Sequence, residues 1–445
     1  MTTHHPTALT SAGAAAIVGR LRTTFRAGHT KPLDWRRKQL GRLREFLVEN
    51  GDAIAEALHA DLRKSRAEVD TMEIGGTVRE IDGLLEHLDG WLEPQHVPVP
   101  AHLPRGTSAR TEYEPLGVTL VISAWNYPVN LLLVPVAGAL AAGNAVVIKP
   151  AEQAAATSAL LAELLPRYLD RDATAVVVGG AEETTLLLAE RFDHIFYTGN
   201  GTVGRAVMAA ATTHLTPVTL ELGGKSPVFV DRDLDIDVVA ERLVLTKFTN
   251  AGQTCVAPDY ILTDPDTAAA LEASLTGALL KRFGEDPKAS DLYGRIVNER
   301  HFDRLTSFLG SGRTVTGGQT DRADRYIAPT VLADVTPEEP VMGEEIFGPV
   351  LPIVTVADLD EAIAFINDRD RPLALYAFTD SATTRRRLAA ETSSGGLGFG
   401  WPMLQLAVST LPFGGVGESG MGHYRGRFSV ETFSHRKGIL DVPLT

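Results

Sequence analysis

The chain has 445 residues, of which 44% are apolar and 22% charged, and its formal net charge is −14. This is the composition of a globular protein of two or three domains, and the acidic balance argues against a nucleic-acid surface, which needs clustered Lys and Arg. No stretch approaches the roughly 20 apolar residues that span a bilayer, and the N-terminus lacks the basic region of a signal peptide, so we expect no membrane anchor.

The first segment, residues 8–95, is predicted to be helical. Leu40, Leu43 and Phe46 recur at helical spacing, with charged residues between them, as expected for amphipathic helices that cover a core. Residues 97–114 are rich in Pro and polar residues and have no helical period, so they form either a linker or an extended arm at a sheet edge.

From residue 117 the chain alternates between apolar strands and short helices. We predict strands over 117–123, 144–149, 173–178, 194–197 and 217–222, and helices over 131–142, 158–169, 182–190 and 202–211. Continuous apolar strands separated by helices indicate a parallel sheet of the doubly wound kind, with helices on both faces.

After residue 224 the pattern restarts and predicts a second α/β domain. Its expected strands cover 227–230, 259–263, 350–356 and 373–378, and its expected helices cover 236–248, 268–283 and 359–367. Two Gly-rich stretches, 393–399 and 413–422, are predicted to be loops that fold back towards a site.

Cys255 is the only cysteine, so no intrachain disulfide and no site built from several thiolates can form. A lone cysteine is more often a small buried apolar side chain than a nucleophile, by roughly two to one. Glu221, at the end of an apolar run and followed by two glycines, reverses those odds, because a nucleophile needs a proton-handling partner. The lone thiol also fits a reducing cytoplasm.

Two features following strands suit a dinucleotide. Residues 196–204 run from a strand into a helix, with Gly199 and Gly204 five residues apart, where phosphate could sit on free backbone N–H groups. Lys149 and Glu152 follow a second strand and suit the hydroxyls of a ribose. The alternatives, which the sequence leaves open, are a tight turn in the first case and a solvated loop pair in the second.

Two further segments could carry chemistry. Asn126 follows a strand, and its amide could stabilise an oxyanion or simply cap the next helix. Residues 343–349 place Glu345 and Phe347 between glycines and a proline, either as a shaped loop that holds a ribose and packs a ring or as an ordinary acidic turn. No spacing typical of a metal site occurs.

Taken together, these motifs resemble the aldehyde dehydrogenase superfamily, and most closely its class 3 branch. The matching stretches occur in order along nearly the whole chain, at residues 216–227, 252–260, 344–350, 411–417 and 431–435. The resemblance implies an α/β fold with a Rossmann-type NAD-binding domain, a second α/β catalytic domain and a small oligomerisation arm.

The resemblance also implies where these parts lie in the chain. The NAD-binding domain would comprise residues 1–96 and 115–223 and would be completed by 411–435. The catalytic domain would cover 224–410. The arm at 97–114 and the terminal segment 436–445 would serve oligomerisation, and extended segments with open edges tend to pair with another chain. We therefore expect a homodimer.

By the same resemblance, Cys255 would attack the aldehyde carbonyl, and Asn126 with the backbone N–H of Cys255 would hold the oxyanion. Glu221 would activate the water that hydrolyses the thioester to a carboxylic acid. A Glu in an apolar pocket has the raised pKa that such a base needs.

A cofactor site is implied as well. Glu345 would bind the nicotinamide ribose with Phe347 packed nearby, and Gly199 and Gly204 would frame the pyrophosphate turn. The resemblance places the adenosine ribose on Lys149 and Glu152.

The carboxylate of Glu152 should repel the 2′-phosphate of NADP, whereas Lys149 could pair with it. We therefore expect NAD to be preferred and NADP tolerated.

One segment departs from the class 3 pattern. Residues 398–405 place the large apolar side chains of Trp401 and Met403 where class 3 relatives carry an Asn-Asp pair and a His. This segment lines the substrate entrance in the family, as Tyr127 lines the pocket. We expect a preference for apolar aliphatic or aromatic aldehydes.

Three other functions are compatible with parts of the pattern. A coenzyme A-dependent, acylating enzyme generally lacks a Glu at the position of Glu221. A non-catalytic member of the fold would lack Cys255 or Glu221. A cofactor-free thiol hydrolase of the papain type would pair its Cys with a His, and no His here is placed to suggest that.

Overall fold

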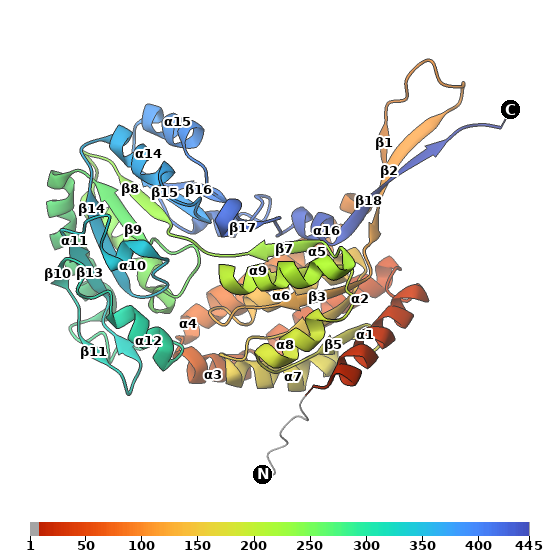
Figure 1. Ribbon diagram of the computed structural model, residues 1–445, viewed down its shortest axis with the longest axis horizontal. Helices are drawn as coiled ribbons and strands as arrows, with labels where there is room; N and C mark the ends of the chain where they lie inside the picture. Colours follow the sequence, from red (N-terminus) through yellow and green to blue (C-terminus); the bar gives the residue numbers. More distant parts are fainter. Residues whose placement is uncertain (1–8, 445) are drawn as a thin grey trace, which may run out of the picture.

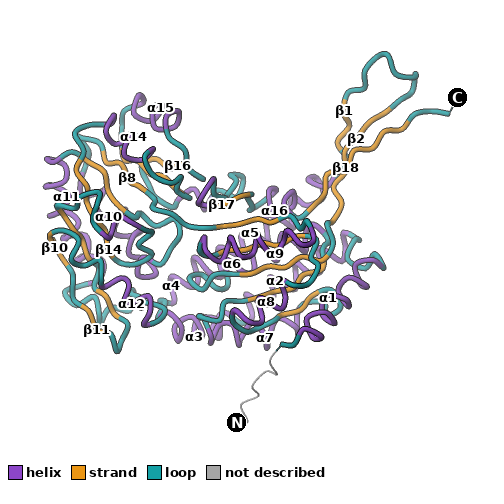
Figure 2. Tube along the Cα trace, in the orientation of Figure 1, coloured by secondary structure: helices purple, strands orange, loops and turns teal. Residues whose placement is uncertain are grey.

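The computed structural model describes residues 9–444, so the predictions for residues 1–8 and 445 lie outside the described part of the chain. Two α/β bodies lie side by side, and a strand-built arm extends away from one of them (Figure 1). Colouring by secondary structure shows helices on both faces of each sheet (Figure 2). The predicted α/β class is confirmed, whereas the predicted domain boundaries stay a prediction.

The first body is built on a six-stranded sheet. In order across the sheet, its strands are β17 (Gly420–Met421), β7 (Val218–Glu221), β6 (His194–Thr198), β3 (Val118–Ile122), β4 (Ala145–Lys149) and β5 (Thr174–Val176). All neighbours are parallel except β17 and β7. The chain runs from β3 outward to β5, then crosses back to β6 and β7. The order therefore reverses between β3 and β6, which is where doubly wound sheets bind ligands.

The four predicted helices around this sheet form close to their predicted bounds, as α6 (Asn130–Ala142), α7 (Ala155–Tyr168), α8 (Ala181–Leu188) and α9 (Gly201–Ala211). The 3₁₀ turn η2 (Thr212–His214) and α16 (Arg427–Thr432) also lie here and were not predicted. Every residue of α6 is buried. This helix ends at Gly143, whose φ of 92° is the left-handed conformation that glycine adopts without strain.

The N-terminal helices pack on the same body. They are α1 (Ser11–Arg26), α2 (Leu33–Glu49), α3 (Gly51–Leu62), α4 (Arg66–Glu68), the π-helical turn η1 (Val69–Ile74) and α5 (Gly75–Leu92). Leu40, Leu43 and Phe46, the residues that predicted amphipathic helices, are fully buried against α6.

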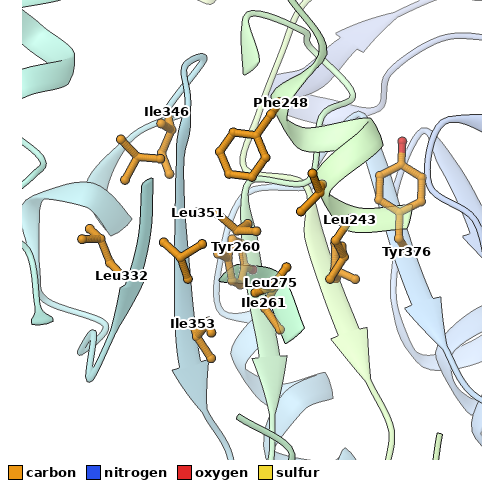
Figure 3. Close-up of a cluster of buried hydrophobic side chains, with 14 of the residues drawn as sticks. Leu243, Phe248, Tyr260, Ile261, Leu275, Leu332, Ile346, Leu351, Ile353 and Tyr376 are labelled. Carbon is orange, nitrogen blue, oxygen red and sulfur yellow. The ribbon is translucent and has the colours of Figure 1, made fainter. Parts of the chain in front are cut away.

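The second body is built on a seven-stranded sheet. In order, its strands are β10 (Arg313–Thr316), β13 (Thr330–Ala333), β14 (Val350–Thr355), β9 (Tyr260–Thr263), β8 (Pro227–Val230), β15 (Ala374–Phe378) and β16 (Gly396–Phe399). All pairs are parallel except β10 with β13. A dense apolar cluster that includes Leu243, Tyr260 and Leu351 fills its interior (Figure 3).

The remaining elements of this body cover the sheet or its edges. They are α10 (Ile236–Phe248), the 3₁₀ turn η3 (Thr249–Gly252), α11 (Pro265–Phe283), α12 (Glu299–Thr306), β11 (Thr320–Asp321), β12 (Tyr326–Ile327), α13 (Pro340–Gly343), α14 (Leu359–Asn367), α15 (Ala382–Glu391) and the 3₁₀ turns η4 (Leu404–Ala407) and η5 (Gly417–Ser419).

The prediction that residues 393–399 form a loop is wrong. Residues 396–399 form β16, which extends the sheet in parallel register beside β15. Glycines lower strand propensity, but the backbone hydrogen bonds of this edge position do not depend on side chains. Residues 413–422 are mostly irregular, as predicted, but Gly420 and Met421 pair with Glu221 and Leu220.

The arm is a three-stranded antiparallel sheet. The strand β2 (Ser108–Pro115) lies between β1 (Gln95–Val97) and β18 (Ser434–Asp441). Of the two readings of 97–114, the extended arm is therefore the one that the structure takes. Figure 1 shows the arm projecting from the body, with the C-terminus near its tip.

Candidate active site

Four predicted site residues follow the carboxyl ends of neighbouring parallel strands. Asn126 lies in the loop after β3, Lys149 ends β4, Gly199 follows β6 and Glu221 ends β7. The backbone N–H of Gly199 donates to the carbonyl of Glu221 at 3.0 Å. Because the carboxyl ends of parallel strands meet at one edge, the topology gathers these residues on both sides of the point where the strand order reverses.

Cys255 comes from the second body, on a turn between α10 and β9. After η3 begins, Asn250 and Ala251 adopt left-handed backbone, with φ of 52° and 50°, and Gly252 follows at 74°. A Cβ at Gly252 would collide with the carbonyl oxygen of Gly348. This tight turn explains the glycine just before the cysteine.

Buried amides attach this turn to the first body. Nδ2 of Asn250 donates to the carbonyl of Asn126 at 2.8 Å, and Nδ2 of Asn126 donates to the carbonyl of Gln253 at 3.0 Å. The hydroxyls of Tyr127 and Thr254 are 2.9 Å apart. Asn126 and Tyr127 therefore lie beside the residues that immediately precede Cys255. The Oδ1 atom of Asn126 is buried without a partner.

The Cys255 thiol lies in a poorly solvated environment. Its residue is part-exposed, yet protein atoms crowd the sulfur, and this desolvation raises the pKa of the thiol to about 12. Glu345 and Glu221 raise the pKa further as acidic neighbours, while the charge of Arg425 lowers it. In this state the cysteine is a thiol at neutral pH, so its activation needs a proton acceptor.

Glu221 has the environment that such an acceptor requires. It is only 1% exposed, and neither carboxyl oxygen has a hydrogen-bond partner among the described residues. Burial raises the pKa of Glu221 well above its usual range, and only Arg425 opposes this shift. A buried carboxyl that makes no structural hydrogen bond is available for chemistry.

Glu345 is a second desolvated acid near the cysteine. Burial and the neighbouring Asp259 raise its pKa to about 8. Gly223 lies directly against its carboxyl group, where any side chain would collide. Phe347 has a φ of 50°, and its ring meets the Trp125 ring edge-on, with centroids 5.3 Å apart. Gly223 and the acidic loop that carries Glu345 and Phe347 thus form one shaped wall.

Lys149 is buried at the end of β4. Its Nζ donates to the carbonyls of Gly179 at 2.6 Å and Pro150 at 2.9 Å, and lies 3.7 Å from the carboxylate of Glu152. Burial lowers the pKa of Lys149, whereas Glu152 and Glu183 raise it. The ammonium group is thus held at the sheet edge beside two carboxylates.

The turn into α9 fits a dinucleotide. A Cβ at Gly199 would collide with the Tyr197 hydroxyl, and one at Gly204 would lie 3.0 Å from Leu222. These glycines form the tight turn into an eleven-residue helix at the switch point of the sheet, where Oδ1 of Asn200 caps the first turn by accepting the N–H of Val203 at 3.0 Å. With Lys149 and Glu152 on the next strand but one, this edge has the donors and acceptors that a cofactor needs.

The three predicted pocket residues do not lie together. Tyr127 contacts Thr254 in the turn that carries Cys255, and Met403 is buried in the core cluster against which Cys255 packs. Trp401 instead lines a groove of 540 Å³ between α10 and α11, with the guanidinium carbon of Arg242 4.7 Å from its ring centroid. Cys255 does not line that groove.

Sequence reasoning missed Tyr424 and Arg425. The Tyr424 hydroxyl and the Arg425 Nε are buried without partners, and the charge of Arg425 reaches both Cys255 and Glu221. The available signal was a tyrosine and an arginine placed between Gly422 and Gly426, just beyond the stretch 413–422 that we predicted as a loop.

A buried ion pair between Lys64 and Glu73 packs against Tyr127, and the sequence analysis missed it as well. Nζ of Lys64 donates to Glu73 at 2.7 Å and lies 3.6 Å from the centroid of the Tyr127 ring. The other Glu73 oxygen accepts the backbone N–H groups of Val129 and Asn130. Lys and Glu are normally surface residues, so their spacing gave no sign of burial.

The assembled groups suit acyl chemistry on a thiol. A nucleophile, a desolvated acid and an amide donor converge from two sheets. No group of His, Cys, Asp and Glu side chains in residues 9–444 could hold a metal ion. Nor does any described helix have the length and apolar character needed to cross a membrane.

Comparison with known proteins agrees with this chemistry. The family model described as "Aldehyde dehydrogenase family" matches residues 2–439. The chain is 50% identical to "Aldehyde dehydrogenase, dimeric NADP-preferring" of Mus musculus over 96% of this chain and 94% of that protein. It is also 50% identical to "Aldehyde dehydrogenase family 3 member B1" of Homo sapiens, over 95% of this chain and 90% of that protein.

A solved structure gives the same result for the fold. The substrate-bound AldH of Staphylococcus aureus superposes with a TM-score of 0.94 at 41% identity, over 96% of this chain and 94% of that one. The resemblance to class 3 enzymes is thus confirmed at the level of family and fold, and the chain belongs to the aldehyde dehydrogenase family.

Proposed function

We propose that this NAD(P)-dependent aldehyde dehydrogenase acts through a covalent intermediate on Cys255 that Glu221 resolves by hydrolysis. The observation that carries the proposal is the Glu221 carboxyl, which is buried at the end of β7 with both oxygens unpartnered. The activity itself, oxidation of an aldehyde to a carboxylic acid, follows from the family. The residue roles below are our inference.

The first step is attack on the carbonyl. Glu221 as carboxylate accepts the thiol proton, directly or through water, and the sulfur of Cys255 bonds to the carbonyl carbon. The second amide hydrogen of Asn126 and the backbone N–H of Cys255 stabilise the oxyanion. Because the first hydrogen already donates to Gln253, the Asn126 amide is fixed in orientation before substrate arrives.

The second step removes the acyl group. When bound, NAD(P) would supply the acceptor for the hydride of the carbonyl carbon, and Cys255 would then carry a thioester. After it has released the thiol proton to solvent, Glu221 takes a proton from water as the water oxygen attacks the thioester carbon. The carbon–sulfur bond breaks, the sulfur leaves as a thiolate that recovers the proton from Glu221, and the carboxylic acid and the free cysteine result. A carboxylate that acts as a general base at this position favours water over coenzyme A as the acyl acceptor.

The cofactor would be held along the edge of the first sheet. Lys149 and Glu152 would bind the adenosine ribose, and the turn from Gly199 into α9 would bind the pyrophosphate. Glu345 would bind the nicotinamide ribose.

The packing of Phe347 on Trp125 would shape the far wall of the nicotinamide site. The position of the α9 turn at the switch point of the sheet and the buried Lys149 support this assignment.

The substrate body would lie in a mostly apolar space. Tyr127 and Met403 supply apolar surface on the side of the catalytic turn, which supports a preference for apolar or aromatic groups near the aldehyde. Trp401 would contact the substrate only farther from the aldehyde group, because its indole lies in the groove beside α10.

We further propose a homodimer in the cytoplasm. The arm projects from the body, and β1 and β18 leave two strand edges open at its sides. The similar mouse protein is named as dimeric, and the lone free thiol suits a reducing compartment.

Replacing the two reacting residues should separate the chemical steps. Cys255→Ala should form no NADH from any aldehyde. Glu221→Gln should release about one NADH per site and then turn over roughly 10²–10⁴-fold more slowly, because the thioester persists. Stopped-flow absorbance measures both.

Glu391→Gln, which alters an exposed carboxyl on α15, is the matched control. Steady turnover by Glu221→Gln, or a requirement for coenzyme A in the wild type, would count against hydrolysis by Glu221.

Activity should rise with pH. Burial raises the pKa of Glu221, so its carboxylate form is lost as the pH falls through that raised value, and the thiol of Cys255 shifts in the same direction. Below the effective pKa the rate should change by up to about tenfold per pH unit. A kcat profile from pH 6 to 9 measures this, and a rate that falls across that range would contradict it.

Cofactor choice should depend on Glu152. We expect a higher kcat/KM for NAD than for NADP, and Glu152→Gln should raise the NADP/NAD ratio roughly fivefold by removing about 1 kcal/mol of repulsion. The exposed Glu163→Gln on α7 serves as control. Tighter use of NADP by the wild type would overturn the preference.

The arm should hold the dimer. Light scattering of the full chain at micromolar concentration should give twice the chain mass, and deletion of residues 436–445 should give a monomer. Lys437→Gln, which breaks only the pair with Glu114, should remain dimeric. A monomeric full chain would refute the proposal.

A further inference from the structure

Arg425 is a cation close to the reacting groups that the mechanism above does not use. Its charge favours the ionised forms of both Glu221 and Cys255. Its side chain lies beside two rings that pack on each other, with the guanidinium carbon 5.3 Å from the centroid of Phe413 and 5.7 Å from that of Tyr424. Phe413 packs against the same apolar cluster as Cys255.

The backbone fixes where this side chain starts. Arg425 has a φ of 79°, which is rare for a residue with a Cβ. Its N–H donates to Oγ of Ser429 at 2.8 Å, and the next N–H, of Gly426, donates to the buried carboxylate of Glu80. A strained conformation held by two such bonds is typical of functional sites.

The guanidinium has few partners of its own. Its hydrogen bond goes from NH1 to the carbonyl of Leu406 at 3.3 Å, and its Nε is buried and unpartnered. No carboxylate in residues 9–444 lies within ion-pair distance of it. Glu80, the nearest acid on α5, is engaged by Gly426 instead.

The other groups that face Arg425 do not neutralise it. Tyr424 and Cys255 have raised pKa values, so both are uncharged at neutral pH. Glu221 is also held towards its neutral form. Arg425 is part-exposed, and its charge is therefore available to an anion that enters the site.

We propose that Arg425 binds a carboxylate carried by the substrate, so that the enzyme prefers aldehydes with an apolar body and a carboxylate distant from the aldehyde carbon. This inference rests on the proposed function of Cys255. A planar guanidinium can donate to both oxygens of a carboxylate, and the Nε of Arg425 has no partner among the described residues. Phe413 and Tyr424 lie beside it with apolar surface that suits the body of such a substrate.

The test compares matched aldehydes. We expect kcat/KM of the wild type to be at least about tenfold higher for 4-carboxybenzaldehyde than for 4-methylbenzaldehyde, with the difference mainly in KM. The same order should hold for 4-oxobutanoate against butanal. In Arg425→Gln the ratio of the two kcat/KM values should fall towards one. In Arg425→Lys the ratio should fall only in part, because the charge remains.

Arg427→Gln is the control, because Arg427 lies two residues away on the exposed face of α16 and pairs with Glu431. The kcat/KM ratio of the Arg427→Gln variant should match that of the wild type. A wild-type ratio near one would overturn the proposal without any variant, and a high ratio that survives in Arg425→Gln would assign the carboxylate to another cation. Failure of the proposed function would differ, since the wild type would then form no NADH from either aldehyde.

Discussion

The site depends on hydrogen bonds between buried amides that join the two bodies. Asn126 follows a strand of the first sheet, whereas Asn250 and Gln253 belong to the turn after α10 in the second. Gln253 extends the connection by donating to the carbonyl of Arg295 and accepting the N–H of Val297. All three side-chain amides donate to backbone carbonyls, and Gln253 also accepts through its side-chain oxygen, so the left-handed turn is fixed in one arrangement. The position of the cysteine relative to the first sheet follows from these contacts.

The electrostatic design follows from the same closure. Because the turn closes over the edge of the first sheet, Cys255, Glu221 and Glu345 share a space with little water, and all three acids are held towards their neutral forms. Neutral acids at close range avoid mutual repulsion, which three ionised groups would suffer. Reactivity must then arise from proton transfer at the moment of reaction, or from a positive charge nearby. The charge of Arg425 favours the ionised forms of Glu221 and Cys255 when no substrate carboxylate is paired with it.

Much of the fold was predictable because apolar runs and helical periods are local. The helices α10 and α14 begin and end where their patterns predict, and so does strand β8. The strand β16 was missed because its glycines give no strand signal, and its pairing with β15 is a non-local contact. The site residues show the same division between local signals and non-local contacts. Cys255 and Glu221 stand in recognisable motifs, whereas Arg425 reaches the site only because residues 413–424 fold back, and Lys64 gains its meaning from burial.

The single cysteine has a practical consequence. Any thiol-directed label that enters the protein has one thiol per chain to modify, so the labelled fraction measured by intact mass reports on Cys255 alone. Because alkylation proceeds through the thiolate, a thiol with a pKa of about 12 reacts slowly in the free protein. A change in labelling rate would then report whether ligands in the neighbouring site alter the ionisation of the sulfur. The sequence therefore carries its own reporter, placed at the proposed reaction centre.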